Sequence, residues 1–396
     1  MGLFKEFGNV SYQDWLDKIT LDLKGKDFQQ TLVWNALEGI NVQPLYNSSS
    51  LANNSSLAKT PLKKYSGWKI RETITITSVE EANKKALIAL KGGANSILFI
   101  GKIKDQQEMD VLLNKIDTTI IELHFYNSTP NHTLSLVHLQ QGSITYDYLG
   151  ELFISSKWNS NQKNDINELT TLTKVENSLK TIEVNGSNYS NLGATVIQEV
   201  AFTLNQAVEY LHLLTDKGIA ATILASKIQF TFGIGSNYFF EIAKIRAARM
   251  LWKLILTQYQ VEDAEYMSIH SITSSNNLTN TETHLNILRT TTEAMSAIMG
   301  GCDSLSVLPY DKSINFSERI ARNIQHILKE EAFLDKVKNP ADGSYYIEQL
   351  TDEIAKNAWT LFQEVEKKGG FLSCLESNFI KDEINTINPL KSVNTI

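Results

Sequence analysis

The sequence predicts an α/β fold, a (β/α)8 TIM barrel with an N-terminal helical extension and a C-terminal helix. Short strand candidates alternate with helical patterns, which is typical of parallel sheets built from βα units. Candidates near residues 70, 97, 121, 137 or 145, 183, 230, 269 and 306 give about eight strands. The length of 396 residues accommodates one barrel of about 250 residues with appendages.

The clearest strand-to-helix unit spans residues 227–258. Residues 228–234 are apolar and rich in β-branched and aromatic side chains, as expected of a strand that is buried on both faces. After Gly233 and Gly235 the period becomes helical, which predicts a mostly buried helix. The two glycines suggest a phosphate-binding turn or close backbone packing. We favour close packing because a third glycine and a ribose-binding acid are missing.

Charged side chains on this helix invite a functional interpretation as well. Arg246, Arg249 and Lys253 fall on one side of it, and the pair Glu330 and Glu331 lies further along the chain. Anion binding or acid–base chemistry would use such groups. A solvated helix face or an inter-helix ion pair is the more economical explanation.

The other elements are placed by period and by capping residues. Ser78 and Gly92 bound a helix as N-cap and terminator. Between residues 126 and 180 the alternation weakens, and both 134–139 and 143–146 are strand candidates. The remaining strands are expected at 68–77, 96–100, 118–125, 181–186, 266–273 and 304–308, and the remaining helices at 165–179, 195–215, 286–299 and 316–333.

The two ends of the chain lie outside the barrel in this scheme. Residues 9–24 have the pattern of an amphipathic helix, and 47–56 form a polar linker of low complexity. Residues 351–368 form a last amphipathic helix. We therefore divide the chain into an extension with linker (1–60), a barrel that is irregular at 126–180 (61–335), and a C-terminal helical segment with a tail (336–396).

Composition excludes several classes of function. The net charge of −7 provides no electrostatic footprint for nucleic acid or for an anionic membrane surface. Cys302 and Cys374 form neither a disulfide framework nor a metal-ligand spacing. The N-terminus has neither the pattern of a signal peptide nor that of a membrane span, so we expect a cytoplasmic protein.

Five runs of sequence carry a family resemblance. They are QEVAFTLNQAVEYL (198–211), FGIGSNYFFEIAKIRAARMLW (232–252), RTTTEAMSAIMGGCDS (289–304), FSERIARNIQHILKEE (316–331) and NPADGSYYIE (339–348). In content and in order they resemble the methylmalonyl-CoA mutase family, over most of the region from about residue 179 to 370. A weaker similarity lies at residues 34–46. The resemblance implies the same barrel, with an acyl-CoA at the C-terminal ends of the strands.

The resemblance also implies an expectation about the cofactor. In the family, adenosylcobalamin is held by a separate C-terminal domain of flavodoxin-like fold that carries Asp-x-His-x-x-Gly. No His in this chain has Asp two positions before it, and little sequence follows Gly370. We therefore expect no cobalamin-binding domain and no cofactor bound by this chain.

At the barrel mouth, most of the residues that match the family's functional positions have changed. Thr73 stands where catalytic subunits have Tyr, and Asn188 stands where they have His, so no catalytic residue is expected. Asn188 can donate a hydrogen bond but cannot transfer a proton. The vestigial substrate-binding candidates are Lys227, Gln229, His270 and Ser271. His270 is better explained as a hydrogen-bonded structural group than as a catalyst.

The resemblance therefore implies a non-catalytic small subunit of a heterodimeric mutase. Its large subunit would carry adenosylcobalamin and isomerise (R)-methylmalonyl-CoA to succinyl-CoA, and residues 9–24 would help to dock the two chains. The run ITYDYLGEL (144–152) resembles the non-catalytic subunits. An isolated chain is expected to form a homodimer through the same surface.

The alternative is a stand-alone barrel that binds an acyl-CoA, or that is active with a separately encoded cobalamin-binding domain. It requires Lys227, Gln229 and His270 to line an open pocket.

Overall fold

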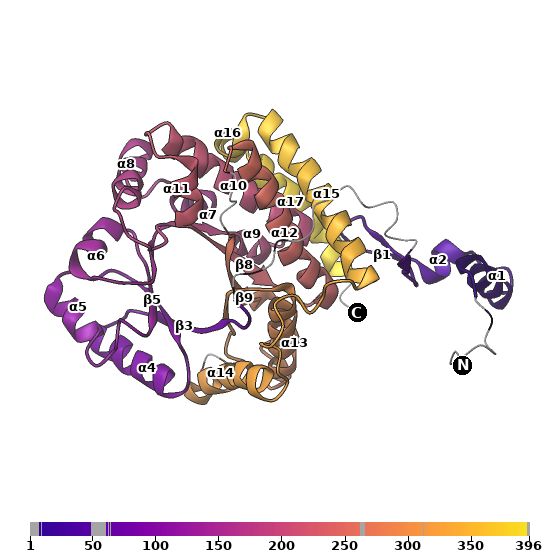
Figure 1. Ribbon diagram of the computed structural model, residues 1–396, viewed down its shortest axis with the longest axis horizontal. Coiled ribbons are helices and arrows are strands. Elements are labelled where there is room, and N and C mark those ends of the chain that lie inside the picture. The colour runs from indigo at the N-terminus through magenta and orange to yellow at the C-terminus, as the bar shows by residue number, and fades with distance from the viewer. Residues whose placement is uncertain are drawn as a thin grey trace, which may run out of the picture.

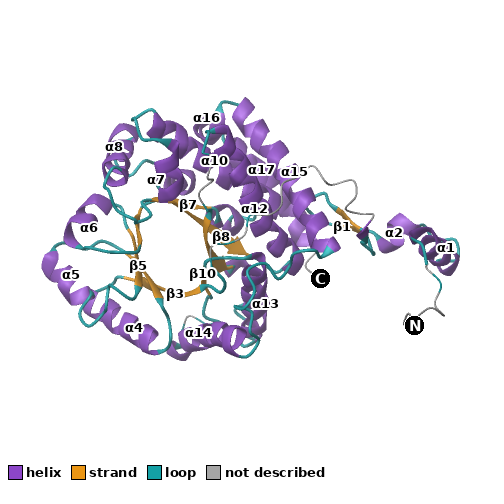
Figure 2. Ribbon diagram, viewed as in Figure 1, coloured by secondary structure: helices purple, strands orange, loops and turns teal. Residues whose placement is uncertain are grey.

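Eight parallel strands form the centre of the molecule. The computed structural model describes residues 8, 10–48, 61, 63, 65–261, 266–311 and 313–393. The sheet has the order β6-β5-β4-β3-β10-β9-β8-β7, and a bridge between Ser143 and Lys180 joins its two edges. Figure 2 shows the resulting ring of strands inside a ring of helices. The expected (β/α)8 barrel is confirmed. The strands are β3 (Lys69–Thr75), β4 (Ser96–Ile100), β5 (Glu122–Tyr126), β6 (Gly142–Thr145), β7 (Ile182–Asn185), β8 (Ile228–Ile234), β9 (Ser268–Thr273) and β10 (Ser304–Ser306).

Helices begin where the sequence supplies caps. The Ser78 side chain accepts a hydrogen bond from the backbone of Glu81, as predicted, and Thr195 forms a capping box with Gln198. Around the barrel lie α4 (Val79–Lys91), α5 (Gln106–Leu112), α6 (Pro130–Leu136), α7 (Tyr148–Ser155), α8 (Gln162–Thr173), α9 (Ser187–Asn191), α10 (Val196–Thr215), α11 (Ala221–Lys227), α12 (Tyr238–Gln258), α13 (Leu285–Gly300) and α14 (Asn315–Glu330). Among the helices of the described residues, none has both the length and the apolar character that are needed to cross a membrane.

One of the two alternative strand predictions is wrong. Residues 134–136 are the end of α6, and residues 137–139 lie in the loop after it, so this run is not a strand. The strand in this part of the chain is β6. Pro130 occupies the first turn of α6, where its missing N–H costs no hydrogen bond. Leu134 and Leu136 then pack against the outside of the sheet. A short apolar run fits a buried strand and a short covering helix equally well.

The strands have one polar face and one apolar face. Their outward side chains pack under the helices and form the apolar core: Ile97, Phe99, Leu123, Phe125, Ile144, Val184, Phe230, Phe232, Ile269 and Leu305. Leu98 and Ile272 also point inward, next to Thr73 and Ser306, but most inward side chains are polar and buried: Arg71, Ser96, His124, Ser143, Thr145, Glu183, Gln229, Thr231, His270, Ser304 and Ser306. Most barrels of this kind fill the interior with branched apolar residues. Here the hydrophobic core lies outside the ring of strands, and the interior is a polar layer.

The C-terminal helices α15 (Tyr345–Lys367), α16 (Gly370–Glu376) and α17 (Phe379–Val393) pack beside the barrel (Figure 1). Arg246 on α12 forms an ion pair with Glu348 on α15 at 2.5 Å, which confirms the inter-helix ion pair for this residue. Arg249 turns to the barrel, where it donates to the Gly301 carbonyl and pairs with Asp303 at 3.1 Å. Both guanidinium groups therefore hold structural elements together, whereas Lys253 is exposed.

The N-terminal part of the chain projects from the barrel as an arm (Figure 1). It consists of α1 (Tyr12–Asp22), α2 (Phe28–Leu32) and the hairpin of β1 (Trp34–Asn35) with β2 (Asn41–Val42). The predicted helix at 9–24 is confirmed as α1, and none of its residues is buried. The predicted linker at 47–56 lies almost entirely outside the described residues.

Candidate functional site: the barrel mouth and interior

Thr73 and Asn188, the two positions at which the family resemblance implies lost catalytic side chains, lie at the C-terminal mouth of the barrel. Thr73 belongs to β3 and is exposed, with its hydroxyl 3.4 Å from that of Ser306. Asn188 belongs to α9, directly after β7, and its amide lies against Gly150. Since β3 and β7 are four strands apart in the ring, the two side chains face the mouth from opposite sides.

Lys227 lies at the other end of the barrel. It is the last residue of α11, immediately before β8, so it is separated from the mouth by the length of that strand. Its ammonium donates to the Asn177 carbonyl at 2.6 Å, to the Asn177 side chain at 2.8 Å and to the Val175 carbonyl at 3.3 Å. Burial lowers the pKa of Lys227. The three donors of this group are thus used to fix the loop after α8.

The other three candidates do not form one site. Gln229 and His270 face the interior from neighbouring strands, one layer apart, and both are buried. Ser271 follows His270 in the strand and therefore points outward, where its hydroxyl lies next to the thiol of Cys302. The structure brings Gln229 and His270 together and leaves Lys227 and Ser271 elsewhere.

A chain of hydrogen bonds crosses the interior between β3 and β6. Arg71 donates to the Ser96 hydroxyl at 3.0 Å and to His124 Nε2 at 2.7 Å. Because a guanidinium only donates, His124 Nε2 must accept, and its proton is on Nδ1. That nitrogen lies 2.8 Å from the Ser143 hydroxyl, which it can therefore reach as a donor. Both ring nitrogens of His124 are engaged.

The interior histidines are held in the neutral form. Burial, supported by the nearby Arg71 charge, lowers the pKa of His124 to about 4 and that of His270 well below its ordinary value. His270 also has Nδ1 2.9 Å from the Ser304 hydroxyl. In the same interior, burial raises the pKa of Glu183 to about 7, although a hydrogen bond from Thr231 opposes the shift. A neutral imidazole cannot act as a cationic acid at neutral pH, so the environment of His270 agrees with a structural role.

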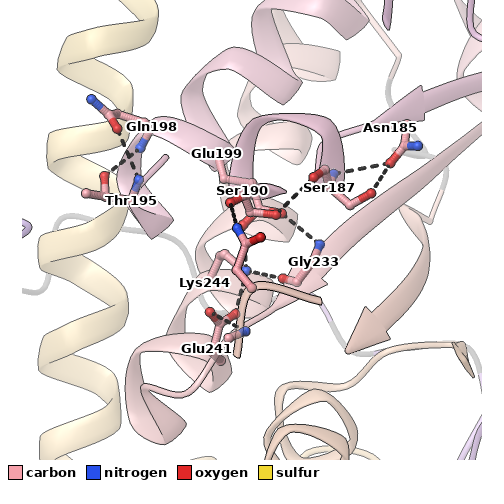
Figure 3. A network of polar contacts seen from close by, with 11 residues as sticks. Asn185, Ser187, Ser190, Thr195, Gln198, Glu199, Gly233, Glu241 and Lys244 are labelled. Carbon is pink, nitrogen blue, oxygen red and sulfur yellow. Dashed lines mark hydrogen bonds and ion pairs between the residues drawn. The ribbon is translucent and has the colours of Figure 1, made fainter. Parts of the chain in front are cut away.

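Behind the mouth, a buried ion cluster fixes the turn between β8 and α12 (Figure 3). Glu199 on α10 accepts from the Gly233 amide at 2.8 Å and from the Lys244 ammonium at 2.7 Å. Glu241 accepts from the Gly235 amide at 2.9 Å and forms an ion pair with Lys244. Lys244 also donates to the Gly233 carbonyl. The two glycine amides are therefore occupied by carboxylates from within the chain.

Steric space at the glycines supports the same conclusion. A Cβ atom at Gly233 would lie 2.2 Å from the Ser190 hydroxyl, and one at Gly235 would lie 3.2 Å from Glu241. Close backbone packing, rather than phosphate binding, is the interpretation that these contacts support.

The charges in this cluster depend on each other. Burial raises the pKa of Glu199 to about 7, and Lys244 opposes that shift. Burial alone would lower the pKa of Lys244, but the carboxylates of Glu199 and Glu241 outweigh it and raise the pKa. The ammonium is thus kept charged by the two acids that surround it.

A second buried carboxylate, Asp147, ties the loop after β6 to α10 and β7. Its Oδ1 accepts from the Gly150 amide at 2.9 Å, from Gln206 at 2.6 Å and from the Tyr210 hydroxyl at 2.8 Å. Its Oδ2 accepts from the Asn185 amide at 3.0 Å. The residue is fully buried. The Asp147 side chain, in the run 144–152, thus accepts hydrogen bonds from four donors.

Sequence reasoning missed most of these groups. Arg71, His124 and Glu183 were not identified as interior residues, and neither were Asp147 and Lys244 as organising charges. A signal for the first three was present, because residues 122–126 and 182–185 alternate polar and apolar side chains. In a strand covered by helices on its outer face, such alternation indicates a polar inner face.

Comparison with known proteins identifies the family. The family model described as methylmalonyl-CoA mutase matches residues 102–392. The methylmalonyl-CoA mutase small subunit of Porphyromonas gingivalis is 38% identical over 98% of this chain. The small subunit of Streptomyces virginiae is 29% identical over 97% of it, and the methylmalonyl-CoA mutase of Cereibacter sphaeroides is 31% identical over 93%.

The chain is shorter than these relatives. It spans 68% of the length of each of the two small subunits and 60% of the length of the Cereibacter sphaeroides protein. The family model nevertheless covers well over half of the chain, and the match to the Porphyromonas gingivalis protein extends over nearly all of it. This chain belongs to the methylmalonyl-CoA mutase family.

Proposed function

We propose that this chain is the non-catalytic small subunit of a heterodimeric, adenosylcobalamin-dependent methylmalonyl-CoA mutase. Its partner, the large subunit, isomerises (R)-methylmalonyl-CoA to succinyl-CoA and binds the cofactor. The observation that carries the proposal is the similarity to a named small subunit over 98% of the chain. In this proposal residues 1–60 dock the partner, 61–335 form the barrel and 336–396 form the C-terminal helical segment.

The chemistry of the barrel interior supports a non-catalytic role. In this family the cobalt-ligating His belongs to the separate domain with Asp-x-His-x-x-Gly, and no His of this chain has Asp two positions before it, so these residues do not fit the family's way of holding adenosylcobalamin. The histidines of the barrel interior bear on proton transfer instead: both nitrogens of His124 are engaged, and His270 is buried at 3% exposure. At the mouth, Thr73 and Asn188 supply neutral polar groups that cannot transfer a proton.

The N-terminal arm supports docking to another chain. Tyr12 stacks on Trp15 with ring centroids 5.4 Å apart, and Trp15 meets Phe28 edge-on at 6.4 Å. No residue of α1 is buried, so this aromatic cluster remains accessible. Where the arm joins the barrel, further apolar side chains are exposed: Trp34, Leu45, Phe239 and Tyr345. Exposed aromatic groups of this kind are typical of protein–protein interfaces.

The docking proposal is tested by purifying the large subunit with a tagged form of this chain. We expect the two chains to co-purify, and the double variant Tyr12→Ala, Trp15→Ala to weaken the complex by about ten-fold or more, because interface aromatic residues carry much of the binding energy. Binding is measured by titration of the large subunit. The melting temperature of the isolated variant should be unchanged, since neither side chain is buried.

The matched control is Gln13→Ala, Asp17→Ala, which alters the same helix at a pair of exposed polar residues that bond to each other at 2.7 Å. It should leave binding within about two-fold of the wild type. Failure of the unmodified chains to co-purify would remove the subunit proposal. Equal weakening by both double variants would remove the role of the aromatic cluster.

The acyl-CoA-binding alternative is less well supported. It needs Lys227 to be available for the ligand, but the donors of that side chain are committed to Val175 and Asn177. For an isolated chain we propose self-association through the surface that would otherwise face the large subunit.

A further inference from the structure

A second pocket lies outside the barrel, between α7, the start of α8 and the C-terminal helices α16 and α17. It has a volume of about 420 Å³, which is within the usual range of small-molecule sites. Its lining combines apolar side chains, which include Leu152, Trp158, Leu372 and Leu375, with the polar side chains of Ser156, Gln162, Glu376, Asn378 and Lys381. An apolar body and a polar head group can therefore be recognised at once.

The positive charge at this pocket comes from Lys381 on α17. Its ammonium lies 3.2 Å from the Ser156 hydroxyl and 5.7 Å from the centre of the Phe153 ring. Within the described residues, no carboxylate lies within 4.0 Å of this ammonium. The cation thus stands at the pocket edge with a neutral hydroxyl and an aromatic face as its neighbours.

The neighbouring groups define the ligand further. Trp158, which is half-buried, offers an aromatic surface, and such a surface favours a flat ring system. Ser156 and Gln162 can bond to an oxyanion that pairs with Lys381. Glu376 also lines the pocket and would repel a second negative charge. We propose that this pocket binds a small aromatic monocarboxylate, with its ring against Trp158 and its carboxylate on Lys381.

The site is independent of the subunit role, because none of its residues belongs to the arm or to the barrel mouth. Its test uses the full chain and isothermal titration with 2-naphthoate, with 2-naphthalenemethanol as the uncharged probe of similar shape. We expect a dissociation constant of roughly 0.1–1 mM for the carboxylate, and about ten-fold weaker binding of the alcohol, since one charge-assisted bond is lost.

Variants test whether Lys381 supplies the positive charge that binds the carboxylate. Lys381→Ala should weaken 2-naphthoate binding about ten-fold while leaving the binding of the alcohol unchanged, and Lys381→Arg should keep most of the affinity. Glu376→Gln should strengthen carboxylate binding about two-fold, because a repulsive charge is removed. Lys253→Ala on α12 is the matched control, since it removes an exposed lysine elsewhere and should change nothing.

Melting curves of each variant establish that it is folded. The proposal is overturned if the wild-type chain shows no binding at a 2-naphthoate concentration about 10-fold above the expected range of the dissociation constant. It is equally overturned if Lys381→Ala and Lys253→Ala bind it as tightly as the wild type does.

Discussion

Replacement of Lys244 by Met is expected to lower the free energy of unfolding by about 3–5 kcal/mol. The ammonium is the common partner of Glu199 and Glu241, and all three side chains are buried. Met fills a similar volume but leaves two carboxylates in a low-dielectric environment with no cation. Urea denaturation followed by circular dichroism measures the loss.

The loss should increase with pH. Without Lys244, the pKa of Glu199 rises above the value of about 7 that it has in the intact cluster. A carboxyl whose pKa is higher in the folded chain than in the unfolded chain stabilises the fold only while it is protonated, so its contribution disappears as the pH rises through the folded pKa. The variant should therefore be closer to the wild type at pH 6 than at pH 8.

Two further variants make this prediction specific. Lys253→Met on the same helix is exposed and should cost less than about 0.5 kcal/mol. Adding Glu199→Gln to Lys244→Met should recover part of the stability, because one unpaired charge is removed. An equal loss for Lys244→Met and Lys253→Met would show that the cluster contributes nothing beyond ordinary packing.

Replacement of Asp147 by Asn is expected to lower the free energy of unfolding by about 2–4 kcal/mol. The two side chains have the same shape, so no cavity is created. The amide of Asn, however, can keep its oxygen toward Gly150, Gln206 and Tyr210 only by turning its N–H group toward the backbone N–H of Asn185, and it loses the negative charge that the four donors share. Chemical denaturation again provides the measurement.

The control for Asp147→Asn is Asp110→Asn, an exposed position that bonds to Gln106 and should cost less than about 0.5 kcal/mol. Tyr210→Phe combined with Asp147→Asn should cost less than the sum of the single changes, since the Tyr210 hydroxyl donates to the carboxylate whose charge Asp147→Asn removes. Strict additivity would contradict the role of Asp147 as the common acceptor.

The fold could be predicted from the sequence because its determinants are local. Each strand is a short apolar or alternating run, and some of the following helices have a side-chain cap, as at Ser78 and Thr195. The prediction was wrong at residues 134–139, where the run is too short for its period to separate strand from helix. The strand predicted at 118–125 also began too early in the sequence. Asp117 and Thr119 form a turn, and β5 begins only at Glu122.

The candidate site was less accessible to sequence reasoning because its contacts join distant segments. Arg71 and His124 are hydrogen-bonded although they are 53 positions apart in the sequence, and Asp147 and Tyr210 are hydrogen-bonded at a separation of 63 positions. Family resemblance drew attention to Thr73 and Asn188, which lie at the barrel mouth. It also drew attention to Lys227, whose partners at Val175 and Asn177 come from a loop that no local pattern predicts.

Ser271 is a different case. Its outward direction follows from the alternation of β9 once His270 is placed in the interior, so strand geometry alone could have removed it from the candidate site. The family resemblance indicates which residue stands at a position, whereas the alternation of the strand indicates the direction of its side chain. Both are needed to place a residue in a site.

The most direct test of the account is the formation of succinyl-CoA from (R)-methylmalonyl-CoA by the purified chain in the presence of adenosylcobalamin, with and without the large subunit. We expect no product from this chain alone, and product when the large subunit is present, because the interior histidines are neutral and engaged and the amide of Asn188 at the mouth cannot transfer a proton. Sustained product formation by the chain alone would contradict the proposal that it is the non-catalytic subunit.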